Sequence, residues 1–162
     1  MSKIKTLYDF KVQDIDNMEF NMAILEGKKV LIVNVASECG LTPQYKELED
    51  LYVKNRHKGF IVIGFPSNDF RGQEPGTNAE IKQFCEDYNI TFPIMAKVSV
   101  NGPDIAPIYK WLTRESENGK FDAVIDWNFQ KFMISENGQL VNFIAPTASP
   151  LSDSIVKWID QS

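Results

Sequence analysis

Two nearly continuous apolar runs dominate the hydrophobic pattern of this chain. Residues 29–35 and 60–65 are rich in β-branched and aromatic side chains, with little polar alternation. This pattern is typical of strands that are buried on both faces. Shorter β-type segments within residues 4–26 flank Asp16 and Asn17, which predicts a hairpin. We therefore expect a buried central sheet that is preceded by an N-terminal β-hairpin.

A second hairpin is predicted later in the chain. The apolar segments 131–134 and 140–144 are joined by a stretch that contains Asn137-Gly138. This dipeptide is typical of a type I′ hairpin turn, so the two strands are expected to be antiparallel. The two earlier runs are separated by a helical pattern and are expected to be parallel. The central sheet is therefore predicted to be mixed.

Helical periodicity separates the predicted strands. One helix is expected to begin at Thr42-Pro43, with Thr42 as its N-cap. Another is opened by Thr77 and Glu80, which form a T-x-x-E capping box. The side chains expected to face inward are Tyr45, Leu48, Leu51 and Tyr52 of the first helix, Ile81, Phe84, Cys85 and Tyr88 of the second, Ile108, Trp111 and Leu112 of a third, and Leu151, Ile155, Trp158 and Ile159 of a last helix capped by Ser149-Pro150. The order of elements predicts a single α/β domain over residues 1–162.

Composition and charge narrow the functional classes. Of the 162 residues, 43% are hydrophobic and 24% are charged, as in an ordinary folded domain. Seventeen Lys and Arg against 22 Asp and Glu give a net charge of −5, which argues against nucleic acid as a partner. No apolar run is long enough to span a membrane, and the first residues do not resemble a secretory signal. We expect a cytoplasmic protein whose thiols are reduced.

Two cysteines carry the candidate chemistry. Cys39 lies between a buried strand and a predicted helix. At such a position, the unpaired N–H groups and the dipole of the helix start favour a thiolate, which is the nucleophilic form. An inert buried cysteine is also compatible with this position. Cys85 falls on the apolar face of its helix, where cysteine is commonly a core residue. A pair of cysteines in a chain of this size excludes a disulfide-based scaffold.

Three sequence blocks resemble the signatures of the glutathione peroxidase family. They are NVASECGLTPQY at 34–45, GFPSNDFRGQEPG at 64–76 and WNFQKF at 127–132. The blocks follow the family's order and spacing, and the resemblance covers nearly the whole chain. It implies a thioredoxin-like fold, in agreement with the predicted mixed sheet flanked by helices. It also implies a peroxidase that needs no metal and no bound organic cofactor.

The resemblance implies roles for five residues. Cys39 would attack the O–O bond of a hydroperoxide and become a sulfenic acid. Gln73, Trp127 and Asn128 would supply N–H donors to the charge that develops on the sulfur and the leaving oxygen. Without the resemblance, Gln73 is also compatible with a surface loop, Trp127 with the core and Asn128 with a turn. Cys85 matches the resolving cysteine of the thioredoxin-dependent branch and would form a disulfide with Cys39.

The expected reaction is the reduction of hydrogen peroxide and organic or lipid hydroperoxides, with thioredoxin as the reductant. Two alternatives stay open: glutathione as the electron donor, or a peroxide sensor that relays its disulfide to a partner protein. A disulfide needs Cα atoms within about 7 Å, so the helix over residues 77–88 is expected to unwind when Cys85 joins Cys39. The segment between Leu112 and Trp127 is shorter than in tetrameric relatives, so we expect a monomer.

Three departures from the family pattern modify this expectation. Ser67 stands where relatives often have a third cysteine, which leaves Cys85 as the intramolecular resolving thiol. Asp69 replaces a usual Gln and is expected to add negative charge near the site. Asn142 lies where relatives often carry a basic residue, which predicts weaker attraction for the anionic glutathione.

Overall fold

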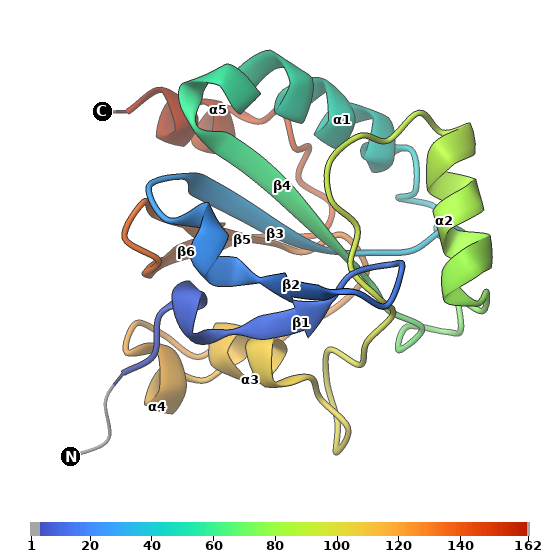
Figure 1. The fold of residues 1–162 in the computed structure, drawn as a ribbon, viewed down its shortest axis with the longest axis horizontal. Helices are drawn as coiled ribbons and strands as arrows, with labels where there is room; N and C mark the ends of the chain where they lie inside the picture. Colours follow the sequence, from blue (N-terminus) through green and yellow to red (C-terminus); the bar gives the residue numbers. More distant parts are fainter. Residues whose placement is uncertain (1–3, 162) are drawn as a thin grey trace.

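A four-stranded mixed sheet forms the centre of the computed structural model, which describes residues 4–161 (Figure 1). Its strand order is β4-β3-β5-β6. The strands β3 (Lys29–Val35) and β4 (Phe60–Pro66) run parallel, as predicted. The strands β5 (Lys131–Ile134) and β6 (Leu140–Ile144) complete the sheet in antiparallel orientation. The predicted mixed sheet is confirmed.

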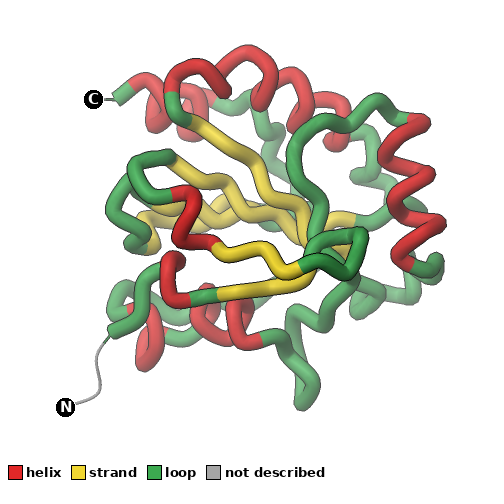
Figure 2. The backbone as a smooth tube through the Cα atoms, viewed as in Figure 1, coloured by secondary structure: helices red, strands yellow, loops and turns green. Residues whose placement is uncertain are grey.

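Helices cover both faces of this sheet, as Figure 2 shows. On one face lie α1 (Gln44–Asn55) and α5 (Asp153–Asp160). On the other lie α3 (Pro107–Thr113) and the hairpin of β1 and β2. The remaining elements are β1 (Lys11–Gln13), β2 (Glu19–Asn21), α2 (Asn78–Asp87), α4 (Glu115–Asn118) and the 3-10 turns η1 (Leu7–Asp9), η2 (Met22–Leu25) and η3 (Arg56–Lys58). In Figure 1, α2 lies at the edge of the molecule, beyond one end of the sheet.

Strand β3 divides the interior into two cores. All seven of its residues are buried. Val30 and Ile32 belong to the core shared with α3, whereas Leu31, Val33 and Val35 belong to the core shared with α1 and α5. Successive side chains of a strand point to opposite faces, so a central strand covered on both sides needs an unbroken apolar run. The C-terminal end of β3 is therefore enclosed by packed side chains on both faces. The candidate site lies directly beyond it.

The predictions for Leu151 and for the turn at Asn137-Gly138 were wrong. Leu151 was expected to face inward, but 44% of it is exposed, because α5 begins only at Asp153 with Ser152 in the N-cap position. The turn at Asn137-Gly138 is not type I′, which requires two residues with positive φ. Only Gly138 has one, at 80°, and its N–H donates to the carbonyl of Ser135 (2.9 Å).

The helix predicted from the T-x-x-E motif is confirmed. Thr77 caps α2, and both hydrogen bonds of the capping box with Glu80 are present. Ile81 and Cys85 point inward as expected, but the prediction for Tyr88 was wrong: it follows the last turn of α2 and is 39% exposed. In the part of the chain described, no helix combines the length and the apolar character needed to cross a membrane.

Candidate active site

Cys39 lies in the turn that connects β3 to α1 and is 8% exposed. Its backbone N–H donates to the hydroxyl of Thr42 (2.9 Å), and that hydroxyl donates to the carbonyl of Ala36 (2.8 Å). The prediction that Thr42 caps the helix was wrong, because α1 begins at Gln44 and the Thr42 hydroxyl is used inside the preceding turn. Thr42 instead fixes the backbone that carries Cys39.

Two N–H groups point at the sulfur of Cys39. The indole N–H of Trp127 donates to Sγ over 3.2 Å, and the backbone N–H of Leu41 donates to it over 3.3 Å. The backbone donor comes from the turn rather than from the first turn of α1. N–H groups at these distances hold the sulfur in one orientation and offer hydrogen bonds to charge that develops on it. The surroundings of Cys39 therefore suit a nucleophile.

Trp127 is held in place by β3 and by its neighbours in the second block. The side-chain amide of Asn34 donates to the carbonyl of Trp127 (3.1 Å), and the N–H of Phe129 donates to the carbonyl of Asn34 (2.6 Å). The ring of Phe70 lies 5.6 Å from the Trp127 ring, and the Arg71 guanidinium lies 6.0 Å from it. Asn34 belongs to the first block, but the sequence analysis gave it no role. A polar residue within an otherwise apolar predicted strand was the signal that could have identified Asn34.

Gln73 and Asn128 are paired with each other. The amide of Asn128 is fully buried, and its Nδ2 donates to Oε1 of Gln73 (3.0 Å). The Gln73 carbonyl also accepts the N–H of Glu38, the residue before Cys39 (3.0 Å). Among residues 4–161, neither amide is hydrogen-bonded to the Cys39 sulfur, whereas Trp127 is. The amide pair thus joins the second and third blocks beside the site.

Glu74 is a buried carboxyl group that the sequence analysis missed. It is fully buried, and one of its oxygens accepts the hydroxyl of Ser37. Burial raises the pKa of Glu74, and the hydrogen bond from Ser37 opposes this increase. Its backbone N–H donates to Asn68 (2.9 Å). A charged residue in a polar loop indicates exposure, so no local signal identified Glu74 as a buried link between the loops of the first and second blocks.

The environment of Cys85 contrasts with that of Cys39. Cys85 is 5% exposed on the inner face of α2, and its S–H donates to the hydroxyl of Tyr45, with Sγ and Oη 3.8 Å apart. Burial raises the pKa of the Cys85 thiol to about 11. Both cysteines are free in the structure. Cys39 is thus an acceptor of N–H groups, whereas Cys85 is a protonated donor.

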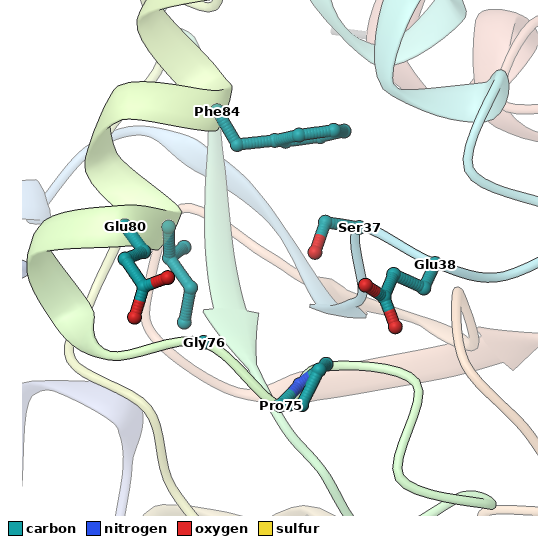
Figure 3. A pocket seen from close by; sticks show the side chains of 7 residues that line it. Ser37, Glu38, Pro75, Gly76, Glu80 and Phe84 are labelled. Atoms are coloured by element: carbon teal, nitrogen blue, oxygen red, sulfur yellow. The ribbon is translucent and has the colours of Figure 1, made fainter.

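A cavity of about 310 Å³ lies between the Cys39 turn and α2. Figure 3 shows Ser37 and Glu38 on one side of it and Glu80 and Phe84 of α2 on the other. Asp69, which was expected to add charge at the site, instead accepts hydrogen bonds from the loop at 99–101. Within residues 4–161, no group of three or more His, Cys, Asp or Glu side chains is arranged to hold a metal ion.

Comparison with known proteins agrees with the family that the sequence blocks indicate. The glutathione peroxidase family matches residues 7–113, which is more than half of the chain. The chain belongs to the glutathione peroxidase family. Within this family, a glutathione peroxidase-like peroxiredoxin of Schizosaccharomyces pombe is 44% identical over 144 residues, which cover 88% of this chain and 90% of that protein. The family predicted from the sequence blocks is confirmed.

Plant members of the family are similar but longer. A chloroplastic phospholipid hydroperoxide glutathione peroxidase of Arabidopsis thaliana is 49% identical over 148 residues, which cover 90% of this chain and 62% of that protein. The chain likewise spans less than two thirds of two further Arabidopsis relatives, one named chloroplastic and one named mitochondrial. Similarity to these proteins therefore covers only part of their length.

Solved structures confirm the thioredoxin-like fold. The structure of Trgpx in its apo form is 36% identical and matches with a TM-score of 0.76 over 98% of both chains. A thioredoxin family protein from Chlorobium tepidum is only 19% identical, yet it matches with a TM-score of 0.68 over 98% of both chains. The predicted fold class, a mixed sheet flanked by helices with an N-terminal hairpin, is therefore correct.

Proposed function

We propose that this chain is a peroxidase in which Cys39 reduces hydrogen peroxide and organic or lipid hydroperoxides. The observation that carries the proposal is the pair of N–H groups, from Trp127 and Leu41, that point at the Cys39 sulfur. The sulfur attacks the terminal peroxide oxygen, the O–O bond breaks, and the alkoxide or hydroxide leaves as alcohol or water after protonation. Cys39 is oxidised to a sulfenic acid and the peroxide is reduced. No metal or organic cofactor takes part in these steps.

Gln73 and Asn128, the two amide residues that the family resemblance indicated, support this chemistry from beside Cys39. Gln73 and Asn128 supply amide groups beside Cys39, and Asn128 holds Gln73 through its own N–H. When peroxide occupies the site, the free N–H₂ group of Gln73 is available to the leaving oxygen. Donors that are fixed before the reaction stabilise developing charge without reorganisation. We therefore assign Cys39, Gln73, Trp127 and Asn128 to catalysis.

Cys85 is proposed to resolve the sulfenic acid. Its thiol forms a disulfide with Cys39, and the hydroxyl of the sulfenic acid leaves as water. Thioredoxin then reduces the disulfide by thiol–disulfide exchange. The name of the S. pombe relative, a glutathione peroxidase-like peroxiredoxin, supports this scheme. The buried position of Cys85 supports a movement of residues 77–88 during the cycle.

The test is an NADPH-coupled peroxide assay, run with thioredoxin and thioredoxin reductase and, in parallel, with glutathione and glutathione reductase. We expect turnover with thioredoxin only, and loss of that turnover in Cys85→Ser. Turnover with glutathione that Cys85→Ser retains would contradict thioredoxin as the donor. Oxidation of Cys39 without turnover in either assay would favour the alternative of a peroxide sensor that passes its disulfide to a partner protein.

We further propose that residues 1–162 act as one monomeric domain in the cytoplasm, without a nucleic-acid partner. The acidic net charge of −5 supports the last point. Light scattering after size exclusion tests the monomer, with the mass of a dimer or tetramer as the contradicting result. A C-terminal fluorescent fusion tests the compartment, and signal confined to an organelle would contradict it.

A further inference from the structure

Tyr45 is the centre of an aromatic cluster that connects α1 to α2. It is fully buried in the first turn of α1. Its ring centroid lies 5.9 Å from Phe84 and 6.1 Å from Tyr88 at the inner face and end of α2. It also lies 6.4 Å from Phe92 and 5.5 Å from Phe129. Phe129 belongs to the third family block, so one ring joins the resolving helix to the segment that carries the active-site donors.

The hydroxyl of Tyr45 holds the sulfur of Cys85. The Cys85 S–H donates to Tyr45 Oη over 3.8 Å, and within residues 4–161 the hydroxyl has no other hydrogen-bond partner. Both groups are buried. Burial raises the pKa of each, so both keep their protons at neutral pH. The thiol is therefore kept in its less reactive form and fixed against α1.

Elsewhere along α2, Ile81 is also buried, but a cavity and an exposed ion pair adjoin the helix. The cavity of about 310 Å³ separates Phe84 from the Ser37–Glu38 segment, as Figure 3 shows. On the outer side, the ion pair of Lys82 with Asp16 (2.6 Å) is about half exposed, and such pairs contribute little to stability. The helix thus has two buried attachments: Ile81 near its start, and Cys85, whose aromatic neighbours meet Tyr45.

We propose that Tyr45 is a positioning residue that controls how fast Cys85 reaches oxidised Cys39, an inference that rests on the proposed function. In that step, the S–O bond of the Cys39 sulfenic acid breaks and an S–S bond to Cys85 forms. The hydroxyl leaves as water with the proton of the Cys85 thiol. The thiol must first leave Tyr45 Oη, so this contact slows the step and prolongs the life of the sulfenic acid. A longer-lived sulfenic acid is more readily oxidised by a second peroxide to sulfinic acid.

The test is Tyr45→Phe, which removes the hydroxyl and keeps the ring. Rapid-quench samples treated with dimedone and analysed by mass spectrometry separate thiol, sulfenic acid, disulfide and sulfinic acid. We expect disulfide formation to become about two- to tenfold faster, since one hydrogen bond is lost, and the sulfinic acid yield at high peroxide to fall. Oxidation of Cys39 to sulfenic acid should keep its rate. A purely structural role of Tyr45 would not change the ratio of disulfide to sulfinic acid.

Tyr52→Phe is the matched control. Tyr52 lies on the same helix, its ring is 6.2 Å from Phe92, and within the described chain its hydroxyl is hydrogen-bonded to no other residue. An unchanged or slower disulfide step in Tyr45→Phe would overturn the inference, as would an equal acceleration in Tyr52→Phe. If Cys39 of the unsubstituted protein remains a thiol after peroxide treatment, the proposed function itself is wrong. If Cys39 is oxidised and only the Tyr45 effect is missing, this inference alone fails.

Discussion

The indole N–H of Trp127 lies 3.2 Å from the sulfur of Cys39, although 88 positions separate the two residues. The sheet brings them together, because β5 pairs antiparallel with β3. The segment before β5 therefore lies beside the segment after β3, at the same end of the sheet. Asn34 then ties the two segments through its hydrogen bonds with Trp127 and Phe129. The candidate nucleophile Cys39 and the Trp127 donor are thus positioned by the buried centre of the sheet.

Replacement of Trp127 by Phe removes this N–H and keeps an aromatic ring. We expect the second-order rate of Cys39 oxidation by hydrogen peroxide to fall by about 10²–10³, the usual effect of losing one preorganised donor. Trp111→Phe is the control, because Trp111 donates its indole N–H to the carbonyl of Lys5 (2.8 Å) away from the site. Equal rates in the two variants, measured by stopped flow, would contradict a catalytic role for Trp127.

Gln73 and Asn128 are expected to act as a unit. Asn128 donates to Gln73 over 3.0 Å, so each single alanine variant disrupts the same pair. The double variant should oxidise Cys39 no more slowly than Asn128→Ala alone, with a coupling of about 0.5–3 kcal/mol in a double-mutant cycle. Gln130→Ala is the control, because its amide bonds Val124 and Asp126 instead. Additive effects of Gln73→Ala and Asn128→Ala would show that the pair is not functional.

Thr42 is expected to stabilise the Cys39 turn through its hydroxyl. Thr42→Val leaves the N–H of Cys39 and the carbonyl of Ala36 without their buried partner. We expect a loss of about 1–3 kcal/mol in the free energy of unfolding, together with slower oxidation of Cys39. Thr42→Ser keeps the hydroxyl and should retain most of the stability and most of the rate of Cys39 oxidation. Urea unfolding and peroxide kinetics measure the two effects, and equal behaviour of Val and Ser would contradict the account.

Ionisation of Cys85 is expected to destabilise the fold at alkaline pH. Burial raises its pKa from 9.0 to about 11, so between these values the unfolded chain loses a proton that the folded chain keeps. The stability from the buried thiol is therefore fully present below pH 9 and is lost as the pH rises through 11. The difference in free energy of unfolding between the unsubstituted protein and Cys85→Ala should decrease by about 2–3 kcal/mol over this range. A constant difference from pH 8 to pH 11 would contradict the assigned shift.

The parts of the fold that depend on local patterns could be predicted from the sequence. The bounds of β3 follow from its nearly continuous apolar run, and the start of α2 follows from the capping box of Thr77 and Glu80. The three blocks identified the family and contain four of the five candidate residues, whereas Cys85 lies outside them. In these cases, the information lies within a few consecutive residues.

The errors arose where hydrogen bonds or the boundary of an element, rather than the local residue pattern, decide the structure. Thr42 looked like a helix cap, but its hydroxyl is used by the backbone around Cys39. Glu74 looked exposed, but the hydroxyl of Ser37 and the fold of the loop bury it. Leu151 looked like a core residue, but the last helix starts after it. Residue types alone do not reveal such competition for hydrogen-bond partners.

Every step of the proposed reaction depends on oxidation of Cys39 by peroxide. The most direct measurement is mass spectrometry of the protein after one equivalent of hydrogen peroxide and alkylation of the remaining thiols. We expect an unalkylated protein two hydrogen masses lighter, with the peptides of Cys39 and Cys85 joined, and no reaction in Cys39→Ser. The account would be contradicted if Cys39 remained an alkylatable thiol, or if Cys39→Ser consumed peroxide as fast as the unsubstituted protein.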